Sequence, residues 1–382
     1  MAKSWLEMNF GEEYPVNLLK RMLEIYSPSG RERDLSLFLA DELGKLGFER
    51  VWRDSVGNVY GEVGSGEPSV LLCGHMDTVP GWIPVRVEGN RLYGRGAVDA
   101  KSSLAAMIVA ASSLRRDISR GRVIVACVVD EEGEAKGIRH LLREKLSVNY
   151  AIFGEPSGIN RITFAYKGHL KLKIKIKSST GHVGAQHLLY NAAEKCFEIW
   201  ARIKRVCEEK YKSPSGIFYS LTPAILGVFS RGSTRSIPDE CTLIIDFRLP
   251  PTISCCKTIE ILSDLIEDFR LENNGLIVDF NVVDRVEPYV ANRDTIVIRA
   301  LREAILEETG EEAKLIRKTG TGDMNIFGAH FKIPVATYGP GDSSLSHTPN
   351  EYIEISEYLV SIKVYKRAVE KILETESCGL TV

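Results

Sequence analysis

The chain lacks an apolar run long enough to cross a membrane, and it has almost no net charge. A membrane-spanning helix needs about 20 predominantly apolar residues, so we expect no membrane partner. The 49 Lys and Arg residues are balanced by 51 Asp and Glu residues, which argues against a nucleic acid as an obligate partner. Residues 1–5 form no apolar signal core. We therefore expect a cytoplasmic protein.

Paired cysteines are also missing. None of the eight cysteines belongs to a Cys-x-x-Cys pair, and most lie in apolar runs. This pattern predicts reduced, buried side chains rather than disulfides or zinc thiolates. No cysteine lies in a nucleophile motif, which argues against a thiol hydrolase. Glutamine occurs once, at Gln186, and such depletion of heat-labile amides is typical of thermophile proteins.

Three apolar runs that are typical of buried strands each end in charged residues. The runs are Val70–Cys73, Arg122–Val129 and Tyr150–Phe153, and the residues that follow them are His75 and Asp77, Glu131 and Glu132, and Glu155. Because the strand-like runs alternate with helical patterns, we expect an α/β fold, with helices on both faces of a mixed, mostly parallel sheet. The carboxyl ends of these strands then line one crevice, where open α/β sheets bind their ligands.

His75 and Asp77 are two residues apart on an extended segment, so their side chains point to the same side. A histidine that binds a metal usually has a carboxylate behind it, which gives Asp77 the role of orienting His75. Asp99 follows on a glycine-flanked loop, just before the apolar helix expected at Ser102–Leu114. This half-site of one histidine, one orienting aspartate and one bridging aspartate is typical of two-metal hydrolases.

The second half of such a site needs another histidine, further carboxylates and one free carboxylate as a base. The residues that supply the whole set are His75, His347, Asp99, Glu132, Glu155 and Glu131. We therefore expect two divalent ions, zinc or cobalt, because both metals accept these ligands.

The pattern changes after Ala165. Lys167–Lys177 alternates strictly between apolar and basic residues, as one-sided antiparallel strands do. The elements that follow have the order strand, helix, strand, strand, helix, strand, which is the ferredoxin-like arrangement. We therefore expect an inserted α+β domain at 167–288 and a discontinuous catalytic domain at 1–166 and 289–382.

The four lysines of this strand, at 171, 173, 175 and 177, allow two interpretations. Lysines often protect the exposed edge of a sheet against aggregation. Four like charges on one face could instead attract an acidic partner protein, with a strong dependence on salt.

Six motifs, in order along the chain, resemble those of the M20 metallopeptidase family. They are Gly74-His75-Met76-Asp77, Gly96–Lys101, Asp130-Glu131-Glu132, Gly154-Glu155-Pro156, Gly181-His182 and Ser346-His347-Thr348. The resemblance covers nearly the whole chain, and six ordered motifs make chance improbable. It implies a lid and dimerisation role for the inserted domain, and hence a homodimer.

The resemblance also implies a role for each matching residue. One ion would be held by His75, Asp99 and Glu155, and the other by Asp99, Glu132 and His347, with Asp99 bridging. Glu131 would be the proton shuttle, and His182 would stabilise the oxyanion, often from the partner subunit in this family. Arg248 would contact a substrate carboxylate, and the loop Gly320–Asp323, with Gly322 and Asp323, would line the substrate pocket.

Within the family, two segments most resemble hydrolases that release lysine or ornithine from a carrier protein. The first segment is Tyr166–His169, and the second consists of Tyr338–Ser343 together with His347–Glu351. The resemblance implies that the substrate is a small acidic amino-group carrier protein, whose terminal glutamate side chain forms the amide that is cut. The alternatives are deacylation of a free small molecule, such as N-acetylornithine, N-succinyl-diaminopimelate or a dipeptide, and a non-catalytic binding protein on the same fold.

Overall fold

The computed structural model describes residues 13–118, 120–144, 146–233 and 235–378. The chain divides into two compact units. Unit 1 comprises the chain up to Phe164, the segment Ala291–Ile316 and the chain from Gly322 onwards; unit 2 comprises Ala165–Val290 and Arg317–Thr321. None of the described helices is both long and apolar enough to span a membrane.

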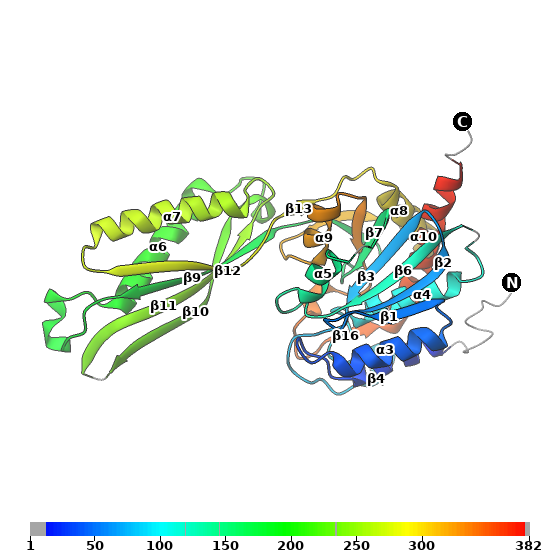
Figure 1. Cartoon of the computed structure of the whole chain (residues 1–382), viewed down its shortest axis with the longest axis horizontal. Helices are drawn as coiled ribbons and strands as arrows, with labels where there is room; N and C mark the ends of the chain where they lie inside the picture. The colour runs from blue at the N-terminus through cyan, green and yellow to red at the C-terminus, as the bar shows by residue number, and fades with distance from the viewer. Residues whose placement is uncertain (1–12, 119, 145, 234, 379–382) are drawn as a thin grey trace. The chain divides into compact units, whose positions relative to one another are not determined.

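A mixed sheet forms the centre of unit 1 (Figure 1). Seven of its nine strands are, in spatial order, β1 (Arg50–Arg53), β2 (Val59–Ser65), β6 (Gly121–Val128), β3 (Ser69–His75), β7 (Tyr150–Gly154), β15 (Val335–Tyr338) and β8 (Arg161–Tyr166). The four central strands β6, β3, β7 and β15 are parallel. Strands β2 and β8 pair antiparallel to them on the two sides, and β1 pairs antiparallel to β2. The carboxyl ends of the parallel strands therefore meet at one edge of the sheet.

Helices cover both faces of this sheet. They are α2 (Tyr14–Glu24), α3 (Arg33–Lys45), α4 (Lys101–Leu114), α5 (Lys136–Leu141), α8 (Ile296–Thr309), α9 (Asp323–Phe331) and α10 (Ile355–Cys378). Gly74 and Gly154 approach the side chains of α4 on one face, whereas Phe153 packs against Phe327 of α9 on the other. The predicted α/β fold, with a parallel centre and helices on both faces, is confirmed.

The buried core of unit 1 follows from the apolar runs. Every residue of β3 is buried, and so is every residue of α4. A helix that is apolar all round is stable only when protein surrounds it. Because α4 begins two residues after Asp99, the same burial holds the end of the Asp99 loop in place.

A small sheet carries the loops around Asp99 and His347. It consists of β4 (Arg86–Glu88), β5 (Arg91–Tyr93) and β16 (Tyr352–Glu354), with β5 in the middle. The antiparallel pairing of Tyr93 with Tyr352 brings together two parts of the chain that are 259 residues apart in sequence.

Unit 2 has an antiparallel sheet in the order β10 (Thr222–Ser233), β11 (Ser236–Leu249), β9 (Gly168–Lys177) and β12 (Ile277–Val286). Helices α6 (Ala192–Lys210) and α7 (Cys255–Glu272) lie on one face (Figure 1). The apolar side of β9, from Leu170 to Ile176, is buried in the core beneath these helices. This arrangement has the ferredoxin-like order that the sequence predicts.

Three elements differ from the sequence-based expectations. The apolar segment Val51–Val63 is typical of one strand in sequence, but it forms the hairpin of β1 and β2. The Asp54 carboxylate accepts the backbone N–H groups of residues 56–58 and stabilises a turn there. Strand β8 and helix α9 were not predicted. The remaining short elements are η1 (Val183–Leu188), η2 (Ile217–Tyr219), β13 (Tyr289–Val290), β14 (Lys314–Lys318) and η3 (Ser343–Leu345).

Candidate metal centre

Six of the predicted site residues gather at the carboxyl edge of the parallel strands. His75 is the last residue of β3, Glu155 follows β7, and Glu131 and Glu132 follow β6; Asp99 precedes α4, and His347 lies between η3 and β16. Their ligand atoms form three overlapping groups within 4.8 Å: His75, Asp99 and Glu155; Asp99, Glu132 and His347; and His75, Glu131 and Glu132. All six lie in unit 1.

Asp99 is the centre of this arrangement. Its Oδ1 lies 3.4 Å from Nε2 of His75, and its Oδ2 lies 3.4 Å from Nε2 of His347. The two histidines lower the pKa of Asp99 well below its usual range, although burial opposes this. One carboxylate thus presents an oxygen to each of two histidines, which is the geometry of a bridging ligand.

Each histidine has a second carboxylate neighbour. His75 Nε2 lies 3.7 Å from Glu155 Oε1, and His347 Nε2 lies 2.7 Å from Glu132 Oε1. Asp99 and Glu132 raise the pKa of His347 to about 10. Two sets of one imidazole and two carboxylates therefore share Asp99.

A metal ion fits the chemistry of His75. Its Nδ1 lies 3.0 Å from the backbone carbonyl of Asp77, so the neutral ring carries its proton on Nδ1 and leaves a lone pair on Nε2. This Nε2 is buried and has no hydrogen-bond partner. A buried polar atom without a partner is costly, and a divalent cation would satisfy it.

The Asp77 carboxylate has several close neighbours. Its Oδ1 lies 3.5 Å from Nδ1 of His75, and the orienting role expected for it stays a prediction. The carboxylate also accepts the backbone N–H groups of Glu131 and Glu132, each at 3.0 Å, and the hydroxyl of Ser29 at 2.7 Å. Asp77 therefore fixes the loop that follows β6.

Glu131 has the electrostatics of a proton acceptor. Burial raises its pKa well above the usual value, and Glu155 raises it further, while His75 opposes the shift. A general base works best when its pKa lies close to the operating pH. Glu131 is absent from the two groups that share Asp99, so it can stay free of both ions.

Asp323 and Gly322 lie at the start of α9, in unit 1. Asp323 is only 5% exposed, and its Oδ1 has no hydrogen-bond partner. Burial raises its pKa to about 8; His75 opposes the shift and Glu155 adds to it. A carboxyl group buried this deeply offers little surface to a substrate, and its contact with substrate stays a prediction.

Two predicted residues, His182 and Arg248, lie in unit 2. His182 is exposed, and its Nδ1 accepts the backbone N–H of Gly184 at 3.1 Å, so its neutral ring carries a proton on Nε2 that it can donate. Arg248 is 39% exposed. Its Nε lies 2.7 Å from Asp246 Oδ2, and its Nη1 donates to Thr321 Oγ1 at 3.2 Å.

The four lysines of β9 do not protect a sheet edge, because β9 is an inner strand between β11 and β12. The register places Asp246 and Asp284 opposite Lys171, Asp279 opposite Lys175, and Glu240 opposite Lys177. Lys175 pairs with Glu240 at 2.8 Å. Acidic neighbours therefore compensate most of this positive charge, which weakens the case for a basic docking strip.

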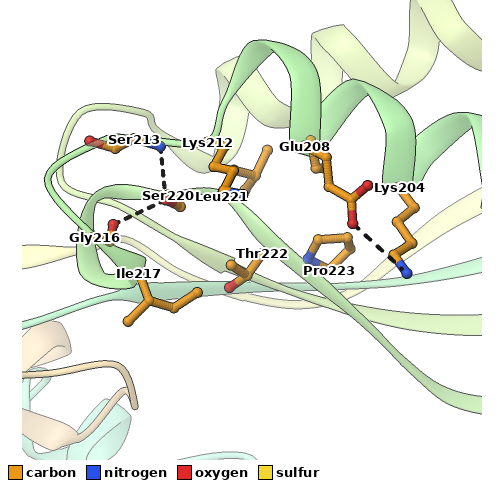
Figure 2. A pocket seen from close by; sticks show the side chains of 11 residues that line it. Lys204, Glu208, Lys212, Ser213, Gly216, Ile217, Ser220, Leu221, Thr222 and Pro223 are labelled. Atoms are coloured by element: carbon orange, nitrogen blue, oxygen red, sulfur yellow. Dashed lines mark hydrogen bonds and ion pairs between the residues drawn. The ribbon is translucent and has the colours of Figure 1, made fainter.

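A separate pocket of about 570 Å³ lies in unit 2 beside the loop after α6 (Figure 2). Ser220 accepts the N–H of Ser213 and donates to the carbonyl of Gly216, and Lys204 faces Glu208 at 3.8 Å. None of the predicted site residues lines it. These polar groups pair within the lining of the pocket, and we assign it no ligand.

Known proteins match this chain over most of its length. The model of peptidase family M20/M25/M40 matches residues 71–371. A Pyrococcus abyssi protein that bears the provisional name LysW-lysine/LysW-ornithine hydrolase is 35% identical over 96% of both chains. The LysW-lysine/LysW-ornithine hydrolase of Sulfurisphaera tokodaii is 33% identical over 96% of this chain and 98% of its own. The LysW-lysine hydrolase of Deinococcus radiodurans is 33% identical over 93% and 96%, respectively.

Solved structures share the fold at lower identity. A Staphylococcus aureus tripeptidase superposes with a TM-score of 0.80 at 20% identity, over 94% of this chain and 98% of its own. An M20 family metallo-carboxypeptidase from Sulfolobus solfataricus gives 0.78 at 20% identity, over 94% and 99%. On the strength of the family match and the curated relatives, the chain belongs to peptidase family M20/M25/M40.

Proposed function

We propose that this hydrolase uses two divalent metal ions to cut an amide bond. The observation that carries the proposal is the position of Asp99, with one carboxylate oxygen 3.4 Å from each histidine Nε2. His75, Asp99 and Glu155 would hold one ion, and Asp99, Glu132 and His347 the other. Zinc and cobalt both suit imidazole and carboxylate ligands.

When bound, such ions polarise an amide carbonyl and lower the pKa of a bound water. The residues of the chain supply the proton transfer. Glu131 takes the proton of the attacking water and delivers it to the leaving nitrogen, as its raised pKa allows. Asp77 keeps Glu131 in place through the backbone N–H of that residue.

The proposed substrate is a small acidic amino-group carrier protein that bears lysine or ornithine on the side chain of its terminal glutamate. The support is that relatives at 33–35% identity over nearly the whole chain are named for LysW-linked substrates. In this proposal Arg248 binds a substrate carboxylate, and the proton on His182 Nε2 stabilises the oxyanion. The seven cysteines whose side chains the structure describes are free thiols, in keeping with the cytoplasmic location that we propose.

We further propose that unit 2 acts as the lid and the dimerisation domain, and that His182 acts in the site of the partner subunit. Strand β10 lies at the edge of its sheet and exposes Leu226 (57%) and Phe229 (61%). An edge strand with exposed apolar side chains is open to pairing with another chain. Sedimentation of the native protein and of Phe229→Glu tests this proposal. We expect a dimer for the native protein and a weaker dimer for the variant, and a monomeric native protein would contradict the proposal.

The experiment that tests the function compares four substrates: carrier-linked lysine, carrier-linked ornithine, N-acetylornithine and N-succinyl-diaminopimelate. Each is assayed with zinc, with cobalt and with a chelator. We expect metal-dependent release of lysine or ornithine from the carrier only. Turnover of a free acyl amino acid alone would be consistent with the proposed metal chemistry but would contradict the proposed carrier-protein substrate. No turnover of any substrate by protein that holds two metal ions would favour a binding protein.

A further inference from the structure

Arg95 and Glu351 form a buried ion pair that connects the loops of two proposed metal ligands. Arg95 is 7% exposed and Glu351 is 1% exposed. Nη1 of Arg95 lies 2.8 Å from Oε2 of Glu351. In sequence, Arg95 lies four residues before Asp99, and Glu351 lies four residues after His347.

The contacts of the pair are crossed. Glu351, from the His347 loop, accepts the backbone N–H of Asp99 at 3.0 Å and that of Val98 at 2.9 Å. Arg95, from the Asp99 loop, donates to the carbonyl of Thr348, the residue after His347, at 3.0 Å. Each member of the pair therefore holds the backbone beside the ligand on the other loop.

A third segment is tied to the same pair. Nε of Arg95 donates to the carbonyl of Gly81 at 3.1 Å, on the segment that follows Asp77. The backbone N–H of Gly94 also donates to the carbonyl of Glu351 at 3.3 Å. With both side chains buried, these contacts leave little freedom for Asp99 and His347 to move apart.

Stability alone is a weak reason for such a pair. Desolvation of two buried charges cancels much of their attraction, and a well-packed apolar pair is often equally stable. The positions of the hydrogen bonds are more informative, since they end on the backbone next to Asp99 and His347. Bridged ions require their ligands at fixed separations, and groups that orient ligands contribute strongly to metal affinity.

We propose that Arg95 and Glu351 are positioning residues that set the separation of Asp99 and His347, and with it the affinity of the Asp99, Glu132 and His347 group for its ion. The inference rests on the ligand set proposed above. Arg95 acts through the His347 loop, so its loss weakens binding of the ion that Asp99, Glu132 and His347 hold. Glu351 acts through Asp99, which both ligand groups share, so its loss weakens binding of both ions.

The chain offers a matched control in the two strands next to this pair, β5 and β16. Arg91 of β5 pairs with Glu354 of β16 at 2.8 Å. These side chains are 48% and 35% exposed. Arg91 donates to Glu354, which also accepts from Asn90, and none of these residues belongs to the ligand set. Arg91→Met therefore removes an arginine–glutamate pair from this small sheet without touching Asp99 or His347.

The test is metal titration of the full-length, metal-free protein, with zinc affinity measured by competition and cobalt followed by visible absorption. We expect the native protein and Arg91→Met to bind two ions. Arg95→Met should bind one ion normally and the other about 10 to 100 times more weakly, with an altered cobalt spectrum. Glu351→Gln should bind both ions more weakly.

Circular dichroism shows which variants are folded. If Arg95→Met does not fold, Arg95→Lys replaces it in the metal titration. Lysine keeps the charge but cannot reach Gly81, Thr348 and Glu351 together, so we expect the same loss to a smaller extent. Folded Arg95 variants with native affinities and the native cobalt spectrum would overturn the inference. A native protein that does not bind two ions would instead overturn the proposed ligand set.

Discussion

Asp77 accepts a hydrogen bond from the backbone N–H of Glu131, at 3.0 Å. The same carboxylate holds the next N–H, that of Glu132, at the same distance. A buried carboxylate thus fixes, through the backbone, the proposed base and a proposed metal ligand. The position of the reactive groups depends on this contact as much as on their own side chains.

Asp77→Asn should therefore weaken metal binding by about 10 to 100 times. Asparagine has one carbonyl oxygen where aspartate has two acceptors, so at least one of the two backbone N–H groups loses its partner. We expect a cost of about 1–3 kcal/mol in the free energy of unfolding, measured by urea denaturation of the metal-free protein.

Asp54→Asn is the matched control. In the turn between β1 and β2, Asp54 Oδ1 accepts three backbone N–H groups, and Oδ2 accepts from Asn58 Nδ2 and the Tyr60 hydroxyl. Asparagine keeps only one of these two acceptor oxygens, and the turn lies far in sequence from the ligands. This variant should lose stability and keep the native affinity for metal. Native metal affinity in Asp77→Asn would contradict the role assigned to Asp77.

Glu131→Gln should reduce the rate of amide hydrolysis by about 100 to 10,000 times, because the amide side chain cannot accept the proton of water. The two groups that share Asp99 are intact in this variant, so it should still bind two ions. Glu134→Gln is the control, since Glu134 is 76% exposed and should be fully active. Loss of an ion from Glu131→Gln would show that Glu131 is a ligand.

Removal of metal should abolish hydrolysis and lower the melting temperature without unfolding the protein at room temperature. The core of β3 and α4 is apolar and independent of any ion. Ligand at about 100 times its dissociation constant stabilises a fold by about 2.7 kcal/mol. Calorimetry with and without chelator measures the shift, and equal melting temperatures would contradict tight binding at this site.

Lys167 gives a prediction on pH for unit 2. Its Nζ donates to the carbonyls of Ile217 and Ser220 and to the hydroxyl of Thr222. Burial, with help from Arg248, lowers its pKa to about 8, below the usual value of about 10.4. Between these two values the unfolded chain binds more protons than the folded one, so the contribution of Lys167 to stability rises with pH.

Urea denaturation of the native protein and of Lys167→Met, at several pH values from about 7.5 to 10, measures this contribution as a difference. The free energy of unfolding of the native protein, minus that of Lys167→Met, should increase as the pH rises. A shift in the opposite direction would mean that the three hydrogen bonds hold the charged form more strongly than burial opposes it.

The parts of the fold that the sequence predicts are those with a strong local pattern. Strand β3 is a short, continuous apolar run that ends in His75, as buried strands often are, and β9 alternates strictly between apolar and basic residues with a period of two. The turn at Asp54 could also have been found, because aspartate, glycine and asparagine lie together there. Helix α9 is short and has no clear amphipathic period, and the sequence gives little sign of it.

Contacts between distant segments account for what was missed at the site. The sequence suggests that Asp77 faces His75, but not that its carboxylate binds the loop 54 residues further on. Arg95 and Glu351 are 256 residues apart, and nothing in the sequence indicates that they pair with each other. Their roles depend on the packing of three loops, which residue spacing does not reveal.

The most direct test of the central claim is anomalous X-ray diffraction from crystals of the native protein soaked in zinc. Two peaks are expected: one among His75, Asp99 and Glu155, and the other among Asp99, Glu132 and His347. Paired ions of this kind lie about 3.5–4 Å apart, and Asp99 should contact both. A single peak, or two peaks that do not share Asp99, would contradict the account.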